Sequence, residues 1–240
     1  MIKRYILVVL VIFSVVVSSK EIVKIPEASG IDYCKDSDTL IVANDEGWYY
    51  EIRRDGKILS KNRVKKYDLE GVICKKKNFI FAVEDKGLLK VNRETKKSRL
   101  IKINPKYNSK KVKLLDKDTG IEGIAKSKED LYYISKQSKK RESSFIAVVK
   151  IKNSRAKIVN IIKHKIVDIA GLTIHNGYLY MVSDKKNILL KYDIKKEKVL
   201  EKIKLSKMAQ EGIAFDNKGF YYIADDNGRV MRYEISSIEY

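Results

Sequence analysis

One short phrase, a glycine followed by a strand, a turn and a second strand, occurs five times along this chain of 240 residues. The copies begin ASGIDY at Ala28, LEGVIC at Leu69, IEGIAK at Ile121, IAGLTI at Ile169 and QEGIAF at Gln210. Their glycines, at positions 30, 71, 123, 171 and 212, are 41, 52, 48 and 41 residues apart. A unit of this length cannot bury its apolar face alone, so the copies must pack on one another.

Each copy continues in the same way. The second strands read TLIVAND, FIFAVED, LYYISK, YLYMVSD and FYYIADD, and the third read WYYEIRR, LLKVNR, FIAVVKIK, ILLKYDI and VMRYEI. They are rich in Tyr, Val, Ile and Phe, as strands are, and a fourth strand such as KVLEKIKL from Lys198 follows in several copies. Four short strands in about 40 to 50 residues are typical of one propeller blade. The sequence therefore predicts an all-β fold, a five-bladed β-propeller of four-stranded antiparallel blades.

The two ends of the repeat array predict how the ring closes. The last copy has room for three strands after Gly212, and we expect the segment Glu21 to Ile25 to supply the fourth strand of that blade. This pairing would also cover an open sheet edge. Two polar insertions, from Asn104 and from Lys136, are expected to be surface loops. We therefore expect residues 20–240 to form one β-propeller domain.

Residues 1–19 have the pattern of a secretory signal. Lys3 and Arg4 precede the apolar run from Tyr5 to Val17, and Ser18 and Ser19 are the small residues that signal peptidase prefers. A bilayer span needs about 20 apolar residues, so the run is short for one, but an uncleaved membrane anchor stays an open alternative. We expect a cell-envelope protein on the periplasmic or extracytoplasmic side, in contact with the membrane through this segment.

The net charge of +20 does not by itself indicate a nucleic-acid partner. Of 51 basic residues, 41 are Lys, whereas base and phosphate recognition favours Arg. The lysines are spread along the whole chain, so we predict a solvated basic surface and no nucleic-acid binding.

The two cysteines, Cys34 and Cys74, occupy nearly equivalent repeat positions. The sequence leaves open whether they form a disulfide or remain two buried thiols.

Acidic residues gather just before the repeated glycines. One residue before the glycine stand Ser29, Glu70, Glu122, Ala170 and Glu211, and three before it stand Glu27, Asp68, Gly120, Asp168 and Ala209. Since side chains alternate along a strand, both positions are expected on the face that lines the central channel. No Lys or Arg occupies either position. Carboxylate oxygens without His or Cys suit Ca²⁺ best, then Mg²⁺. The alternative is that these side chains bond backbone N–H groups and brace the ring.

A second acidic set ends the second strands: Asn44, Asp45, Glu84, Asp85, Asp184, Asp225 and Asp226. Asp and Asn at such positions usually build turns, and Asp184 and Asp225 are the expected exceptions. His164 stands in a Lys-rich stretch and is expected to be solvated, and His175 is expected to be a turn or core residue rather than a catalytic base.

These phrases, from EASGIDY through AQEGIAFDNKGFYYIADD, resemble the SdiA-regulated (YjiK-like) family of bacterial envelope proteins over residues 27–234. The resemblance implies a five-bladed propeller, distantly similar to NHL repeats, behind an N-terminal membrane segment, and it implies calcium binding. The matching positions are Glu70, Glu122 and Glu211, with Asp68 and Asp168 as lesser candidates and Glu27 as the acid of the first copy. The chain departs from the family pattern at Ala170, Cys34 and Lys126.

Two functions fit these observations. The first is a monomeric, non-enzymatic binding module that holds Ca²⁺ at the central channel and presents a face to a protein, a glycan or a small molecule. The second is a calcium-dependent hydrolase of lactones or phosphate esters, in which the ion polarises the substrate and a Glu or Asp activates water. No recognisable catalytic motif favours the second, and the catalytic residues stay unknown.

Overall fold

A computed structural model of the chain describes residues 19–117, 119–138 and 140–237. The predicted signal or anchor segment lies outside these residues, except for Ser19, which begins the first strand. In the part of the chain that is described, no helix has the length and apolarity needed to cross a bilayer.

The fold is all-β, and its strands follow the repeat. The first two copies form β2 (Ala28–Cys34), β3 (Thr39–Asn44), β4 (Trp48–Arg53), β5 (Ile58–Arg63), β6 (Leu69–Lys75), β7 (Asn78–Val83), β8 (Gly87–Asn92) and β9 (Ser98–Asn104). The third and fourth form β12 (Ile121–Lys126), β13 (Leu131–Lys136), β14 (Ile146–Lys152), β15 (Arg155–Ile162), β16 (Ile169–His175), β17 (Tyr178–Ser183), β18 (Ile188–Asp193) and β19 (Lys198–Lys204). The last forms β20 (Gln210–Phe215), β21 (Phe220–Asp225) and β22 (Arg229–Glu234).

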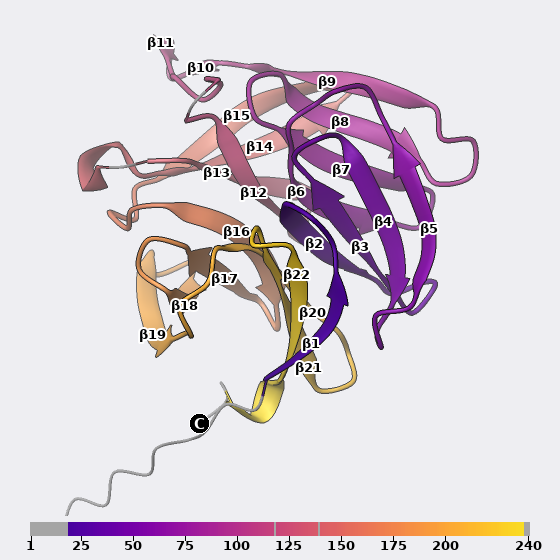
Figure 1. Cartoon of the computed structure of the whole chain (residues 1–240). Helices are drawn as coiled ribbons and strands as arrows, with labels where there is room; N and C mark the ends of the chain where they lie inside the picture. Colours follow the sequence, from indigo (N-terminus) through magenta and orange to yellow (C-terminus); the bar gives the residue numbers. More distant parts are fainter. Residues whose placement is uncertain (1–18, 118, 139, 238–240) are drawn as a thin grey trace, which may run out of the picture.

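Within each copy the strands pair antiparallel in chain order. The sheets β2-β3-β4-β5, β16-β17-β18-β19 and β1-β22-β21-β20 each have four strands. The strands of the second and third copies form one eight-stranded sheet, because β9 and β15 pair in parallel at their outer edges. Figure 1 shows the sheets set around a common centre, the arrangement of a β-propeller.

The first strand of each copy is the innermost. Strand β2 packs on β6, β6 on β12, β12 on β16, β16 on β20, and β20 packs back on β2. A buried apolar cluster lies between each pair of neighbouring copies, including the pair formed by the first and last copies. The core is therefore divided among the interfaces between copies.

The repeated glycine is explained by this ring of inner strands. A Cβ on Gly71 of β6 would lie 2.6 Å from the backbone nitrogen of Ile124 in β12. A Cβ on Gly212 of β20 would lie 2.8 Å from the backbone nitrogen of Ile31 in β2, where the ring closes. Only glycine lets two backbones approach this closely.

The N-terminal strand closes the last sheet, as predicted. Strand β1 (Ser19–Lys24) pairs antiparallel with β22, and the backbone N–H of Ile25 donates to the carbonyl of Gly228 at 3.0 Å. Figure 1 shows β1 beside the C-terminal strands. The outer edge of β22 is thereby covered by the other end of the described chain.

The two insertions contain more structure than a loop. The first forms a small hairpin of β10 (Lys106–Tyr107) and β11 (Lys110–Lys111), and the second contains the short 3-10 helix η1 (Arg141–Ser143).

Cys34 and Cys74, whose state the sequence left open, form a disulfide between β2 and β6 with a Cα–Cα distance of 5.2 Å.

Candidate metal centre

A β-bulge stands where each inner strand begins. In β2, β6, β12, β16 and β20 the pairing register shifts across the residue before the repeated glycine or across the glycine itself. A bulge changes the direction of the side chain that it contains. In the second copy, positions one and three before the glycine nevertheless converge as expected, because Asp68 and Glu70 offer oxygens to the same group of carboxylates.

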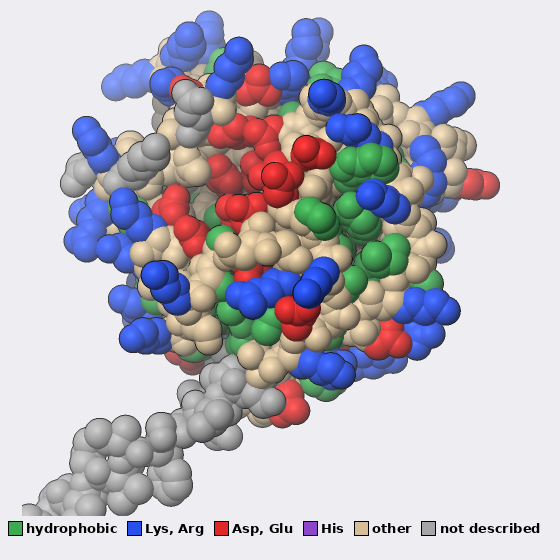
Figure 2. Space-filling view, in the orientation of Figure 1, with side chains coloured by type: hydrophobic (Ala, Val, Ile, Leu, Met, Phe, Trp, Pro, Cys, Tyr) green, Lys and Arg blue, Asp and Glu red, His purple; other side chains and the backbone are tan. Residues whose placement is uncertain are grey.

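The bulges and the neighbouring turns bring five carboxylates together at one end of the ring. They form two triads that share Asp45: one with Asp68 and Glu70, the other with Glu211 and Asp226. In each triad, one oxygen per residue lies within 4.8 Å of the others. We call these five residues the acidic cluster. Figure 2 shows Asp and Glu side chains gathered in the middle of this face, with Lys and Arg around its margin.

Asp45 and Asp226 are the members that the sequence analysis did not single out. Each has a buried Oδ1 atom that has no hydrogen-bond partner among the residues that the structure describes. Asp225, an expected exception to turn building, instead builds the turn: its Oδ1 accepts the N–H groups of Ala209 and Asn227, and its Oδ2 accepts from Arg229. The prediction for Asp225 is wrong because its carboxylate is already occupied.

The same division occurs at the end of β3. The Oδ1 atom of Asn44 accepts the N–H groups of Glu46 and Trp48 at 2.9 and 3.2 Å, which closes the turn. The following residue, Asp45, is left to the cluster. In the pairs Asn44–Asp45 and Asp225–Asp226, therefore, the first residue builds the turn and the second is available to a ligand. In the sequence, this site is indicated by two adjacent Asp or Asn residues at the end of a second strand.

The cluster is electrostatically unfavourable when all its groups are ionised. Burial raises the pKa of Asp45 to about 7, and the charges of Asp68 and Asp226 raise it further. Burial raises the pKa of Glu211 to about 10, followed by the effects of Asp226 and Asp45. The pKa of Glu70 is also well above its usual range, first through burial and then through Glu122. Protonation or a bound cation would relieve this repulsion.

No salt bridge within the described residues joins a basic side chain to a member of the acidic cluster. Arg229, three residues after Asp226, pairs with Asp225 instead, and Lys66, two residues before Asp68, lines a pocket beside the cluster. Several carboxylate oxygens of the cluster are therefore available to bind a positively charged ligand. Hard oxygen ligands of this kind are the preferred donors for Ca²⁺ and Mg²⁺.

The remaining predicted site residues surround the cluster. Glu122 is buried, and its pKa is raised to about 8 by burial and then by Glu84, but it is in neither triad. Glu84 is a brace, since its Oε1 accepts the N–H of Gly120 at 3.0 Å. Asp168 accepts the N–H of Lys185 at 3.1 Å, and Glu27 is exposed. The region therefore contains candidate cation ligands, in the acidic cluster, and a side chain that braces the backbone, Glu84.

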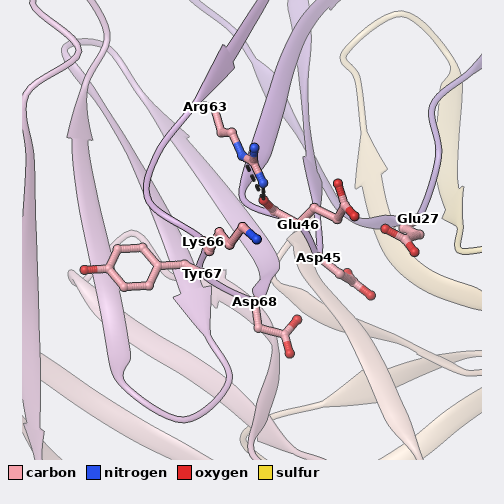
Figure 3. A pocket seen from close by; sticks show the side chains of 7 residues that line it. All are labelled: Glu27, Asp45, Glu46, Arg63, Lys66, Tyr67 and Asp68. Atoms are coloured by element: carbon pink, nitrogen blue, oxygen red, sulfur yellow. Dashed lines mark hydrogen bonds between the residues drawn. The ribbon is translucent and has the colours of Figure 1, made fainter.

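A pocket of about 360 Å³ opens beside the Asp45–Asp68–Glu70 triad. It is lined by Glu27, Asp45, Glu46, Arg63, Lys66, Tyr67 and Asp68. Figure 3 shows Asp45 and Asp68 pointing into the same space, while Arg63 donates to the carbonyl of Glu46 at 3.1 Å. The pocket therefore offers both acidic and basic groups next to the cluster.

Neither histidine belongs to the cluster. The imidazole of His164 is not solvated as expected: its Nδ1 accepts the N–H of Ile166 at 3.1 Å, its Nε2 is buried, and burial lowers its pKa to about 4. His175 stacks on Phe215 with ring centroids 4.4 Å apart, consistent with the expected packing role.

Three comparisons place these features among known proteins. The profile of the family described as SdiA-regulated matches residues 7–231. No curated protein matches the sequence. Many solved structures are similar, among them a luciferin-regenerating enzyme with a TM-score of 0.59 and 12% identity, over 91% of this chain and 95% of that one. At this identity the structural likeness concerns the fold alone.

Proposed function

Because the chain belongs to the SdiA-regulated family, we propose that it is a binding module of the bacterial cell envelope that holds Ca²⁺ in the acidic cluster. We infer five blades, each made of the four strands of one repeat, with β1 completing the last blade. The cluster then lies at one mouth of the central channel, and the adjacent pocket receives a protein, a glycan or a small molecule.

One observation carries the proposal: the buried Oδ1 atoms of Asp45 and Asp226 lie among other carboxylates and have no hydrogen-bond partner within the described part of the chain. A buried acceptor without a partner costs about 1–3 kcal/mol, and more for a charged group. A divalent cation would satisfy these oxygens and remove the repulsion at once. Ca²⁺ is favoured over Mg²⁺ because it accepts 6–8 oxygen ligands in flexible geometry, whereas Mg²⁺ demands a near-ideal octahedron.

The envelope location is supported by two features. Lys3, Arg4 and the apolar run to Val17 have the order of a secretory signal, although they lie outside the described residues. Cys34 and Cys74 form a disulfide, and disulfides form and persist mainly in oxidising compartments outside the cytoplasm. We propose an extracytoplasmic protein on this basis.

A thermal melt of the full chain tests the cation site. With chelator as reference, Ca²⁺ at ten times its dissociation constant adds about 1.4 kcal/mol of stability. We expect Asp45→Asn to abolish most of this shift and Asp36→Asn, an exposed residue in the turn after β2, to retain it. An equal shift in both variants, or none in the native protein, would overturn the proposal.

Calcium-dependent hydrolysis of a lactone or phosphate ester is the second candidate. It is favoured by the pocket, in which Arg63 and Lys66 stand opposite Asp45 and Asp68 and would attract an anionic ester. A bound cation would polarise the substrate oxygen. Turnover of p-nitrophenyl phosphate or a simple lactone that needs Ca²⁺ and is lost in Asp45→Asn would support it. Cation binding without turnover of either substrate would contradict the hydrolase and support the non-enzymatic binding module.

A further inference from the structure

The disulfide lies at the end of the inner strands opposite the acidic cluster. Asp68, Glu70 and Glu211 of the cluster precede repeated glycines, and Asp45 and Asp226 follow strands that run antiparallel to the inner ones. Cys34 and Cys74 instead follow the glycines by several residues on β2 and β6. Cys34 is 1% exposed, and Cys74 is half-buried. Cys74 also lines a cavity of about 170 Å³, and it is the more exposed of the two cysteines.

A carboxyl group stands beside this disulfide. The Oδ2 atom of Asp32 accepts the backbone N–H of Cys74 at 2.7 Å, and Asp32 lines the same cavity. Asp32 and Cys34 are two residues apart on β2, so both side chains lie on one face of the strand. Gly30 is on this face too, and its Cβ would strike the backbone of β6. The carboxyl group therefore lies between the strands that the disulfide joins.

The pKa of Asp32 favours a protonated carboxyl group beside the disulfide. Burial raises its pKa to about 7, although the N–H groups of Cys74 and Tyr33 lower it in part. No ion pair of Asp32 with a described residue is found, and Lys126 of β12, which shares the cavity, binds Asp130 at 2.8 Å.

The other strands around Asp32 add little charge. From β6, Lys75 directs its Nζ to the hydroxyl of Tyr132 at 3.4 Å. Strand β16 contributes Thr173 to the cavity and ends at His175, which stacks on Phe215. Strand β3 contains no charged residue, and Glu211 of β20 belongs to the acidic cluster. Around this cavity, Asp32 is thus the described group whose pKa of about 7 makes its protonation change near neutral pH.

We propose that Cys34–Cys74 is an exchangeable disulfide, reduced by a dithiol that enters this cavity, with Asp32 as the proton donor to the sulfur of Cys34. A thiolate of the dithiol attacks Sγ of Cys74, the S–S bond breaks, and Sγ of Cys34 leaves with the electron pair. Because a buried thiolate is costly, this sulfur takes the proton of the Asp32 carboxyl group.

The second thiolate of the reductant completes the exchange. It attacks the reductant's own sulfur in the mixed disulfide, releases Cys74 as a thiolate that takes a proton from water, and leaves as a cyclic disulfide. The dithiol thus loses two electrons and the protein gains two. Water returns a proton to Asp32. The acidic cluster takes no part in these steps, so this inference does not rest on the proposed cation site.

The rate of reduction by dithiothreitol tests the proposal. The folded full chain is incubated with the reagent between pH 6 and 9 and free thiols are trapped with a maleimide, with circular dichroism as the check on folding. Each rate constant is divided by the thiolate concentration, since the thiolate is the nucleophile. We expect this normalised constant to fall at least tenfold as pH rises through the region around 7, because Asp32 loses its proton there.

Two variants separate Asp32 from other causes. Asp32→Asn should give a normalised constant that is low and independent of pH, whereas Asp36→Asn should match the native protein. If Asp32→Asn does not fold, the native profile still decides, because a flat profile overturns the proposal. Reduction that follows unfolding, rather than preceding it, also overturns it.

The site of attack gives an independent readout. With a monothiol such as glutathione, we expect the mixed disulfide on Cys74 and the free thiol on Cys34, as mapped by peptide mass spectrometry. An adduct mainly on Cys34 would contradict the assigned order of steps.

Discussion

Two adjacent residues at the end of a strand have different roles in this protein. Asn44 and Asp225 accept backbone N–H groups and close turns, while the next residues, Asp45 and Asp226, present unpartnered oxygens to the acidic cluster. Asp225 and Asp226 are the same residue type. In this pair, position relative to the turn therefore decides which carboxylate is available to a cation.

The pKa shifts of Asp45 in the acidic cluster and of the neighbouring Glu122 predict an unusual pH dependence of stability. In chelator, we expect the free energy of unfolding to decrease as pH rises from about 4 to 8. Asp45 and Glu122 have pKa values of about 7 and 8 in the fold but ionise near 4 when unfolded, so the folded state binds more protons in this range. Their contribution is complete below the unfolded pKa and is lost as pH rises through the folded pKa.

Urea unfolding at pH 5, 6, 7 and 8 measures this dependence. Added Ca²⁺ should weaken or reverse it, because the carboxylates must be deprotonated to bind the ion. An increase in stability from pH 5 to 8 in chelator would contradict the assigned protonation of the cluster.

At the scale of strands, close backbone contacts hold the inner ring together. Substituting Gly71 with Ala should destabilise the protein by about 3 kcal/mol, because the new Cβ would lie 2.6 Å from the backbone of β12. Gly177, in the turn after β16, is the matched control: it has φ of +82° and nothing within 4 Å of an added Cβ. Gly177→Ala should cost only about 1–2 kcal/mol. Equal losses by chemical denaturation would mean that inner-strand contact does not select glycine.

The disulfide is a second link between strands. It closes a loop with a sequence separation of 40, for which chain entropy predicts about 4 kcal/mol of stabilisation. We therefore expect the double variant Cys34→Ser, Cys74→Ser to lose roughly that amount in urea unfolding. The shift in melting temperature with Ca²⁺ should persist, since both cysteines lie away from the acidic cluster. An unchanged midpoint would mean that the β2–β6 contact is sufficient without the bond.

At the scale of the whole molecule, closure depends on β1. Ile22 and Val23 pack on the apolar cluster between the first and last copies, and β1 pairs along β22. Deleting residues 1–24 should cost about 2 kcal/mol, or about 4–8 °C in melting temperature, and should promote association through the open edge. Deleting residues 1–18 alone is the control and should leave both properties unchanged. Size-exclusion chromatography with light scattering checks the prediction, and a monomer of unchanged melting temperature without β1 would contradict it.

The repeat in the sequence was sufficient to predict the strands and their order. Strand spacing, the glycine at each inner strand and the use of the N-terminal segment as an outer strand are all confirmed. These features are readable because they depend on local patterns: alternation of apolar residues, turn residues, and a glycine wherever two backbones meet. Glu70, Asp68 and Glu211 were selected by the same repeat, and the structure places them in the acidic cluster.

Which carboxylates would share a ligand was decided only by the tertiary structure. Asp45 and Asp226 reach the cluster from turns that are distant in sequence from Glu70 and Glu211, respectively, and from one another, and the repeated glycines gave no indication of them. Likewise the sequence placed Cys34 and Cys74 at nearly equivalent positions, but only the packing of β2 on β6 joined them and set Asp32 beside them. Local sequence specifies strands because backbone pairing is repetitive, whereas a site depends on single side chains from several strands, and their meeting is set by the geometry of the closed ring.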